Sequence, residues 1–139
     1  MIEPIVTNKA PKPGNYSQGI KVDVGPGYLI YVSGQTGNVI TGNQEVITDR
    51  IYEQTEQALR NIEGVIREVG GSRKNIIDIT AFLTDLKQQK QDFELAYSRF
   101  FGKSESPLPA RALVQVSRIP LVTENCLVEL KATAFVPKR

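Results

Sequence analysis

Two segments with helical periodicity, set among short runs of strand-forming residues, constrain the fold of this chain more than any other feature. Between residues 48 and 69, apolar side chains recur at intervals of three and four, and Gly70 follows as a stop. A second amphipathic stretch, which contains Phe93 and Phe101, ends at Gly102. Thr48 and Asp85 are the predicted N-caps of the two helices. Each helix has one apolar face, so both are predicted to pack against a sheet.

Runs rich in β-branched and aromatic residues predict the strands of that sheet. The first two runs are separated by Gly25-Pro26-Gly27 and predict a β-hairpin. Residues 75–84 are nearly uncharged and predict a central strand with both faces covered. The predicted strands span residues 16–24, 28–33, 75–84, 110–117 and 126–136, with a short edge strand at 2–6.

The resulting order is β-β-α-β-α-β-β, which is typical of an α+β protein. It predicts a mostly antiparallel or mixed sheet with both helices on one face. The chain has 139 residues, so we expect a single domain over residues 1–139. Because the second face of the sheet is left without a cover, we expect an oligomer.

Charge and hydropathy exclude several classes of partner. Lys and Arg number 17 and Asp and Glu 15, and no block of five like charges forms a stripe for nucleic acid. The longest purely apolar run, residues 28–32, is too short to span a membrane. The first ten residues lack the basic head and apolar run of a signal peptide, so we expect a cytoplasmic protein.

The absence of histidine limits the chemistry. The chain contains no His and one Cys, Cys126, which excludes Ser-His, Cys-His and His-metal mechanisms, a disulfide within the chain and a cysteine zinc site. Cys126 begins a strand and is predicted to be a core residue. Any catalysis must therefore use carboxylates, Arg, Lys, Tyr, hydroxyls, backbone groups or water.

Four candidate site residues follow from the strand ends, each with a structural alternative. Gly34 follows a strand without the lysine of a phosphate loop, so it either ends the strand or lets a ligand approach the backbone. Arg111 suits a bidentate carboxylate contact or a surface salt bridge. Glu129 suits proton transfer with a raised pKa or a cross-strand pair with a basic residue. Tyr16, at the entry to a strand, suits amphipathic packing.

Seven short motifs then occur in a fixed order along almost the whole chain, and together they resemble the RidA (YjgF) family of reactive intermediate deaminases. The motifs are GNYSQG from residue 14, VSGQ from 32, TEQALRNI from 55, AFLTD from 81, YSRFF from 97, PAR with VQVSRIP between 109 and 120, and VELKA from 128.

The resemblance implies a chorismate mutase-like fold and a homotrimer with active sites in the clefts between neighbours. It implies hydrolysis of 2-enamine and 2-imino acids, such as imines derived from 2-aminoacrylate, to 2-oxo acids and ammonia, with no metal and no organic cofactor. By position, Arg111 matches the arginine that grips the substrate carboxylate, and Glu129 matches the carboxylate associated with the attacking water. Tyr16, Ser33 and Gly34 match residues that line the pocket.

Three departures from the family pattern leave other functions open. Leu113 stands where a Cys is common, Asn15 stands where a Pro is common, and the connection over residues 121–126 is long. A small-carboxylate-binding protein without turnover is therefore an alternative. The ribonuclease or translation-inhibitor activity ascribed to some relatives is another, but the missing His and the missing basic stripe argue against it.

Overall fold

A computed structural model describes residues 1–40, 45–102, 106–120 and 125–139 of the chain. Its strands and helices follow the predicted order, including the short edge strand at the N-terminus. They are β1 (Ile2–Ile5), β2 (Gly19–Asp23), β3 (Gly27–Thr36), α1 (Ile51–Glu68), a 3₁₀ helix (Arg73–Asn75), β4 (Ile76–Leu83), α2 (Leu86–Phe101), β5 (Ala110–Gln115) and β6 (Val128–Pro137).

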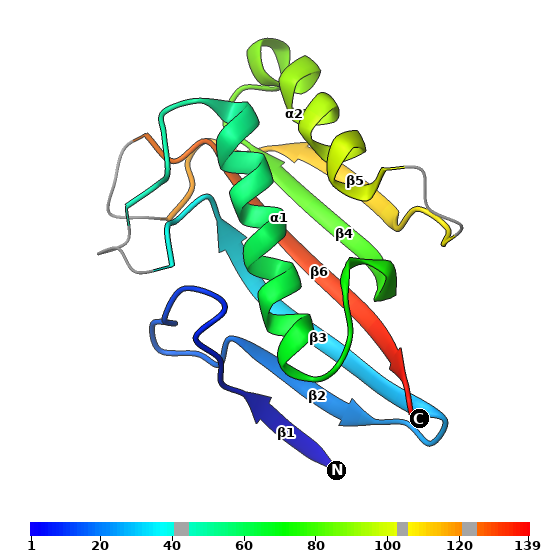
Figure 1. Cartoon of the computed structure of the whole chain (residues 1–139). Coiled ribbons are helices and arrows are strands. Elements are labelled where there is room, and N and C mark those ends of the chain that lie inside the picture. Colours follow the sequence, from blue (N-terminus) through cyan, green and yellow to red (C-terminus); the bar gives the residue numbers. More distant parts are fainter. Residues whose placement is uncertain (41–44, 103–105, 121–124) are drawn as a thin grey trace.

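The six strands form one mixed sheet in the order β1-β2-β3-β6-β4-β5. Only β4 and β5 are parallel, because α2 connects them as a crossover, and every other pair is antiparallel. Both helices lie against the same face, α1 across β3 and β6 and α2 near β5 (Figure 1). The α+β prediction with two helices on one face is therefore confirmed.

The core lies between this sheet face and the helices. Ile30 and Val32 of β3 and Leu130 of β6 are completely buried under Leu59 and Ile62 of α1. Burying each such side chain stabilises the fold by about 1.5–3 kcal/mol. The apolar spacing along α1 therefore determines which face of the helix meets the sheet.

Several bounds of the predicted elements differ in the structure. The strand predicted over 28–33 continues to Thr36, so Gly34 lies within it and does not end it. The last strand begins at Val128 rather than at 126. The first helix begins at Ile51 rather than at 48, and its N-cap, Arg50, makes no side-chain cap. The Thr48 hydroxyl instead accepts a hydrogen bond from the Arg50 N–H at 3.1 Å, which closes a turn before the helix. Among the described residues, the strand over 75–84 has only one covered face, since Asp78 is exposed on the other face and Ile77, in the irregularity beside it, is 47% exposed. By contrast, Asp85 caps α2 as predicted and accepts the Gln88 N–H at 3.3 Å.

The face of the sheet away from the helices, here called the open face, is rich in apolar side chains. Side chains alternate along each strand, so the strand register assigns them to this face. Neither helix covers it in the part of the chain that is described. Tyr31 and Val114 are 44% and 40% exposed there. The open face carries Ile20, Val22, Leu29, Tyr31, Thr80, Phe82, Ala112, Val114, Glu129, Lys131, Thr133 and Phe135.

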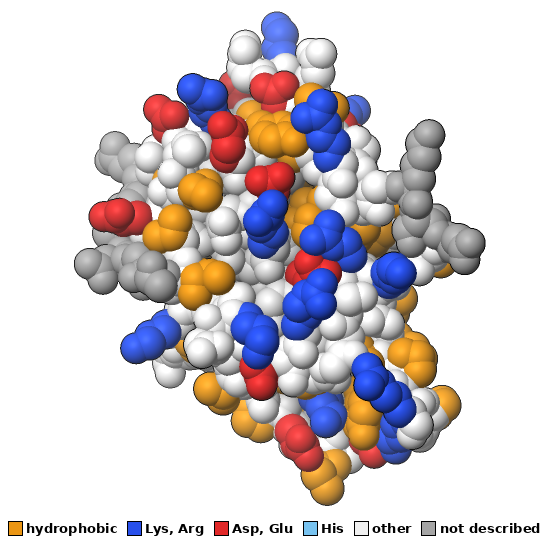
Figure 2. Space-filling view, viewed as in Figure 1, with side chains coloured by type: hydrophobic (Ala, Val, Ile, Leu, Met, Phe, Trp, Pro, Cys, Tyr) orange, Lys and Arg blue, Asp and Glu red, His pale blue; other side chains and the backbone are white. Residues whose placement is uncertain are grey.

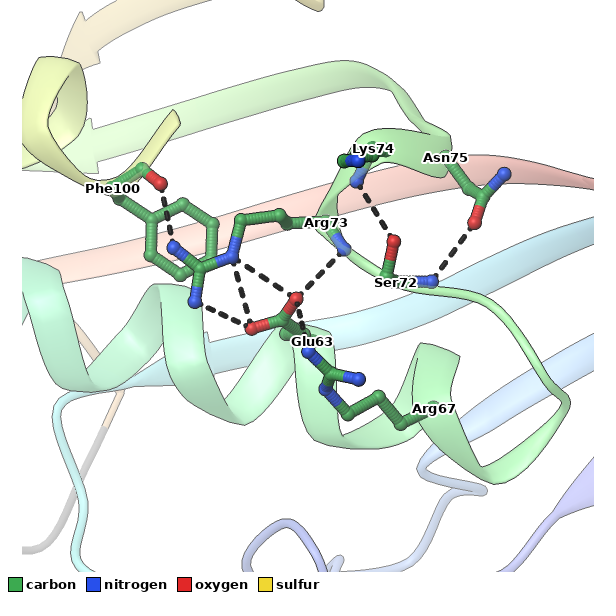
Figure 3. A network of polar contacts seen from close by, with 7 residues as sticks. All are labelled: Glu63, Arg67, Ser72, Arg73, Lys74, Asn75 and Phe100. Carbon is green, nitrogen blue, oxygen red and sulfur yellow. Dashed lines mark hydrogen bonds and ion pairs between the residues drawn. The ribbon is translucent and has the colours of Figure 1, made fainter. Parts of the chain in front are cut away.

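A buried glutamate joins the two helices to the connection between them (Figure 3). Glu63 of α1 accepts hydrogen bonds from the Arg73 backbone N–H at 2.8 Å and from its Nη2 at 2.8 Å, and from Arg67 Nη2 at 3.2 Å. Arg73 Nη1 donates to the Phe100 carbonyl at the end of α2, at 2.6 Å. The network holds the 3₁₀ helix in place and so fixes where β4 begins.

The helix face of the surface carries interspersed charges. Lys and Arg side chains stand beside Asp and Glu side chains over α1 (Figure 2). Neither helix is long and apolar enough to cross a membrane, as far as the structure describes the chain. Nor do any three described Cys, Asp or Glu side chains gather in an arrangement that could hold a metal ion.

Candidate functional site

Glu129 is a carboxylate on the open face without an ion-pair partner among the described residues. It lies on β6 opposite Thr36 on one side and Phe82 on the other, so the cross-strand pair with a basic residue is not formed. No described residue donates a hydrogen bond to it. The side chain is half-buried, and burial raises the pKa of this carboxyl above its usual value.

Glu129 faces a cavity of about 220 Å³ at the end of β3. Tyr16 and Gly34 also line it, so the structure brings together three of the five residues that the sequence nominated. Tyr16 is 58% exposed, which leaves its phenol at the mouth of the cavity. The other lining residues are Pro11, Lys12, Pro13, Gly14, Gln18, Gln35, Thr36, Asn38, Ile119 and Pro120.

A bulge in β3 brings the backbone next to Glu129. The register between β3 and β6 shifts between Val32 and Gln35, which leaves Ser33 and Gly34 in the bulge. A Cβ on Gly34 would clash with Glu129 Oε2 and would lie 3.0 Å from its Cδ. The Glu129 carboxylate therefore occupies space that is free only because Gly34 has no side chain.

Ser33 does not line the cavity. Its hydroxyl donates to the Ser17 carbonyl, and its N–H donates to the Gln18 carbonyl at 3.0 Å. Ser33 thus holds the segment that carries Tyr16 against the end of β3.

Arg111 lies elsewhere, at the edge strand β5. Its Nη1 and Nη2 donate to the two carboxylate oxygens of Glu94 of α2 at 2.6 and 2.8 Å. Its guanidinium also lies over the ring of Tyr97 at 4.7 Å. A cavity of about 330 Å³ adjoins this pair and is lined by Leu108 and Pro109 as well. Within one chain, Arg111 therefore forms a salt bridge with Glu94, which is the structural alternative that the sequence left open for it.

Arg111 and Glu129 do not meet within one chain. Arg111 is in register with the buried Ile79, which places it on the helix face of the sheet. Glu129 points to the opposite face, and β4 separates the two strands. A site that uses both residues therefore needs a second chain.

Comparisons with known proteins identify the family. The chain matches the family model described as Endoribonuclease L-PSP over residues 7–136. It is 39% identical over 140 residues to a RutC family protein of Pyrococcus abyssi, with 96% of each chain covered. It superposes with a TM-score of 0.81 on YyfA of Yersinia pestis, a member of the conserved Rid protein family of unknown function, at 32% identity over 98% of this chain and 100% of the other. The chain belongs to the Rid (YjgF) family.

A further Rid relative was solved with a small ligand. Escherichia coli TdcF with bound serine has a TM-score of 0.81 and 30% identity, with coverage of 96% of this chain and 98% of the other. The two helices and the mixed six-stranded sheet match these neighbours, which confirms the predicted fold class. Trimer formation stays a prediction.

Three positioning residues of this Rid chain were not singled out from its sequence. Gln18 accepts the Thr7 N–H and donates to the carbonyls of Thr7, Ala10 and Pro11, so it shapes the loop in front of Tyr16. Gln54 anchors the segment before Glu129 through the Asn125 carbonyl and the Leu127 N–H. Glu94 holds Arg111. These contacts join segments that are distant in the sequence, so the sequence does not predict them. Of the three residues, only Gln18 lies in one of the seven motifs.

Two other sequence positions are accounted for. Cys126 is buried, which confirms it as a core residue, and burial raises the pKa of its thiol to about 11. Leu113 is partly buried and packs against the core from the strand of Arg111. The long connection over 121–126 lies mostly outside the described residues.

Proposed function

We propose that this Rid protein hydrolyses reactive 2-enamine and 2-imino acids to 2-oxo acids and ammonia. The observation that supports this most is the state of Glu129. It is a half-buried carboxylate at a cavity, no described residue pairs with it, and burial raises its pKa. A carboxyl group with a raised pKa exchanges protons closer to neutral pH, as general acid–base catalysis requires.

The proposed reaction needs little beyond orientation and one proton carrier. An enamine first takes one proton from solvent at its terminal carbon, which gives the imine in the form already protonated at nitrogen. Glu129 accepts a proton from water while the water oxygen bonds to the imine carbon. The carbinolamine then collapses. Glu129 first returns its proton to nitrogen; the hydroxyl oxygen then gives its proton to Glu129 and forms the C=O bond of the 2-oxo acid while the C–N bond breaks and ammonia leaves. Glu129 passes the last proton to solvent. None of these steps requires His, Cys or a metal ion.

We assign Arg111 to the substrate carboxylate, which a guanidinium binds through two parallel hydrogen bonds. Because Arg111 and Glu129 lie on opposite faces of one sheet, we propose that Arg111 of one chain adjoins Glu129 of its neighbour in a homotrimer. Two features support this arrangement: Arg111 lies on an edge strand, and the open face carries exposed apolar side chains such as Tyr31 and Val114.

The activity is tested by coupling the protein to a pyridoxal-phosphate dehydratase and following the decay of the imine with an amine trap. We expect acceleration over buffer, and loss of most of it in Arg111→Ala and in Glu129→Gln with the oligomer intact. Glu56 and Arg60 form an exposed ion pair on α1, so Glu56→Gln and Arg60→Ala are matched charge controls that should keep full activity. No acceleration by the folded wild type would overturn the proposal.

The shared site is tested by mixing the two inactive variants. If each site takes Arg111 from one chain and Glu129 from the next, random mixed trimers at equal amounts recover about one quarter of the wild-type rate. A site confined to one chain would recover nothing, which would refute the intersubunit arrangement.

A carboxylate-binding function without turnover is the second candidate. It is favoured by the bound serine in the TdcF structure and by Leu113 at the position where the family commonly has Cys. Titration with 2-oxobutanoate separates this function from the deaminase activity. Binding of 2-oxobutanoate by a protein that does not accelerate imine decay supports the binding function. The family model's description also names an endoribonuclease; RNA degradation that disappears in Arg111→Ala would be needed to support that activity.

A further inference from the structure

One helix engages both Nη groups of the Arg111 guanidinium. Three residues of α2 hold it: Glu94 through two short hydrogen bonds, and the rings of Tyr97 and Phe93 at 4.7 and 5.6 Å. The hydrogen bonds of Arg111 lower the pKa of the Glu94 carboxyl, so Glu94 carries its charge at neutral pH. The two Nη groups that would grip a ligand carboxylate therefore already hold one.

We propose that Glu94 is a specificity-determining residue of the Arg111 site, because a ligand carboxylate must displace the Glu94 carboxylate from the guanidinium. This inference rests on the proposed role of Arg111 in binding the substrate carboxylate. The exchange breaks two charge-assisted hydrogen bonds and forms two, so net affinity comes from the rest of the ligand. A ligand that offers only a carboxylate binds weakly, and one that also fills the adjoining cavity of about 330 Å³ binds well.

Two features of the structure allow the displacement. The Glu94 side chain is 36% exposed, so its carboxylate has solvent to enter when it leaves Arg111. The aromatic contacts of Arg111 do not involve Glu94, so the guanidinium keeps its place when the ion pair opens. Tyr97 also has a buried hydroxyl without a hydrogen-bond partner among the described residues. Tyr97 lines the same cavity as Glu94 and Arg111.

The test is calorimetric titration of the full-length protein with 2-oxobutanoate, using wild type, Glu94→Gln and Asp92→Asn. Asp92 is exposed on the same helix two residues away, so Asp92→Asn removes the same charge without touching Arg111. We expect Glu94→Gln to bind roughly 5- to 10-fold more tightly than wild type, with a steeper loss of affinity as salt rises. Asp92→Asn should bind as wild type does.

A neutral ligand separates electrostatics from a change of shape. Affinity for 2-oxobutanamide, which lacks the charge, should be unchanged in Glu94→Gln. Glu94→Asp keeps the charge, but its shorter side chain strains the paired hydrogen bonds with Arg111, so its affinity for 2-oxobutanoate should lie between those of wild type and Glu94→Gln. This variant replaces Glu94→Gln in the test if Glu94→Gln does not fold.

The outcomes distinguish this inference from the proposed function. If 2-oxobutanoate binds and Arg111→Ala abolishes the binding, but Glu94→Gln equals wild type or binds more weakly, Glu94 does not compete and this inference alone is wrong. If Arg111→Ala binds as wild type does, or no folded variant binds, the carboxylate role of Arg111 is wrong and the inference falls with it.

Discussion

Replacing Gly34 by Ala separates the role of Glu129 in the site from its role in the fold. A Cβ at position 34 would clash with Glu129 Oε2 and lie 3.0 Å from Cδ, whereas ordinary contacts begin at 3.4 Å. The carboxylate must therefore withdraw by about 1 Å. Because it is the end of a flexible side chain, the fold should lose little stability.

The expected effect is on rate. A misplacement of about 1 Å costs about 100-fold in rate, or ~2.7 kcal/mol of transition-state stabilisation. In the coupled imine assay, Gly34→Ala should lose this factor in kcat with a thermal midpoint close to that of the wild type. The raised pKa of Glu129, which burial causes, should also fall toward its ordinary value as the carboxylate moves toward water. The acidic limb of the rate profile should then shift to lower pH.

Gly25→Ala is the matched control. Gly25 has φ 102°, and no described atom lies within 4 Å of the point that a Cβ would occupy, so Ala there strains the backbone without touching the cavity. It should destabilise the protein by about 1–2 kcal/mol and leave the rate per folded molecule unchanged. A Gly34→Ala variant with a wild-type rate, or one that loses stability as Gly25→Ala does, would refute the reasoning.

Three further predictions concern stability and reactivity. Burial alone would raise the pKa of the Glu63 carboxyl, but hydrogen bonds and charge from Arg73 outweigh burial and lower this pKa below 4.5. The stability that ionised Glu63 contributes to the fold is therefore present above pH 4.5 and is lost as the pH falls through the lowered pKa. Glu63→Gln should lower the free energy of unfolding by about 3 kcal/mol at pH 7. It should also make the thermal midpoint depend less on pH in the acidic range. Tyr97→Phe removes a buried hydroxyl that has no partner in the described part of the chain, so the denaturant midpoint of the variant should equal or exceed that of the wild type; a clear loss would reveal a partner. Cys126, with its thiol pKa raised to about 11, should resist Ellman's reagent at pH 8 until guanidinium unfolds the chain, and fast native labelling would contradict its burial.

The elements could be predicted because their signals are local. Helical spacing in α1, the Asp85 cap and the turn at Gly25-Pro26-Gly27 each depend on residues close in the sequence. The sequence predicts the start of α1 three residues too early, because the Thr48 hydroxyl can accept a nearby N–H either in a turn or as a helix cap, and the residue type does not distinguish the two. The sequence also does not show whether the second face of β4 is covered, because an apolar strand has the same sequence whether that face packs against its own chain or is left open.

The site was predictable only in part, because its contacts are long-range. The motif order nominated Tyr16, Gly34 and Glu129, and the structure brings these three to one cavity. No spacing rule connects Arg111 to Glu94, which lies 17 residues earlier on another element. Ser33 shares the motif of Gly34, yet the bulge turns its hydroxyl to Ser17 rather than to the cavity.

The sequence by itself determined which chemistry is available and which elements form, because both depend on residue types and local spacing. The lack of His leaves carboxylates and Arg as the principal reactive groups. The tertiary structure alone decided where those groups point. Strand alternation and sheet order send Arg111 to the helix face and Glu129 to the open face, on either side of β4. The face of a side chain depends on register with distant strands, and register is a property of the folded sheet.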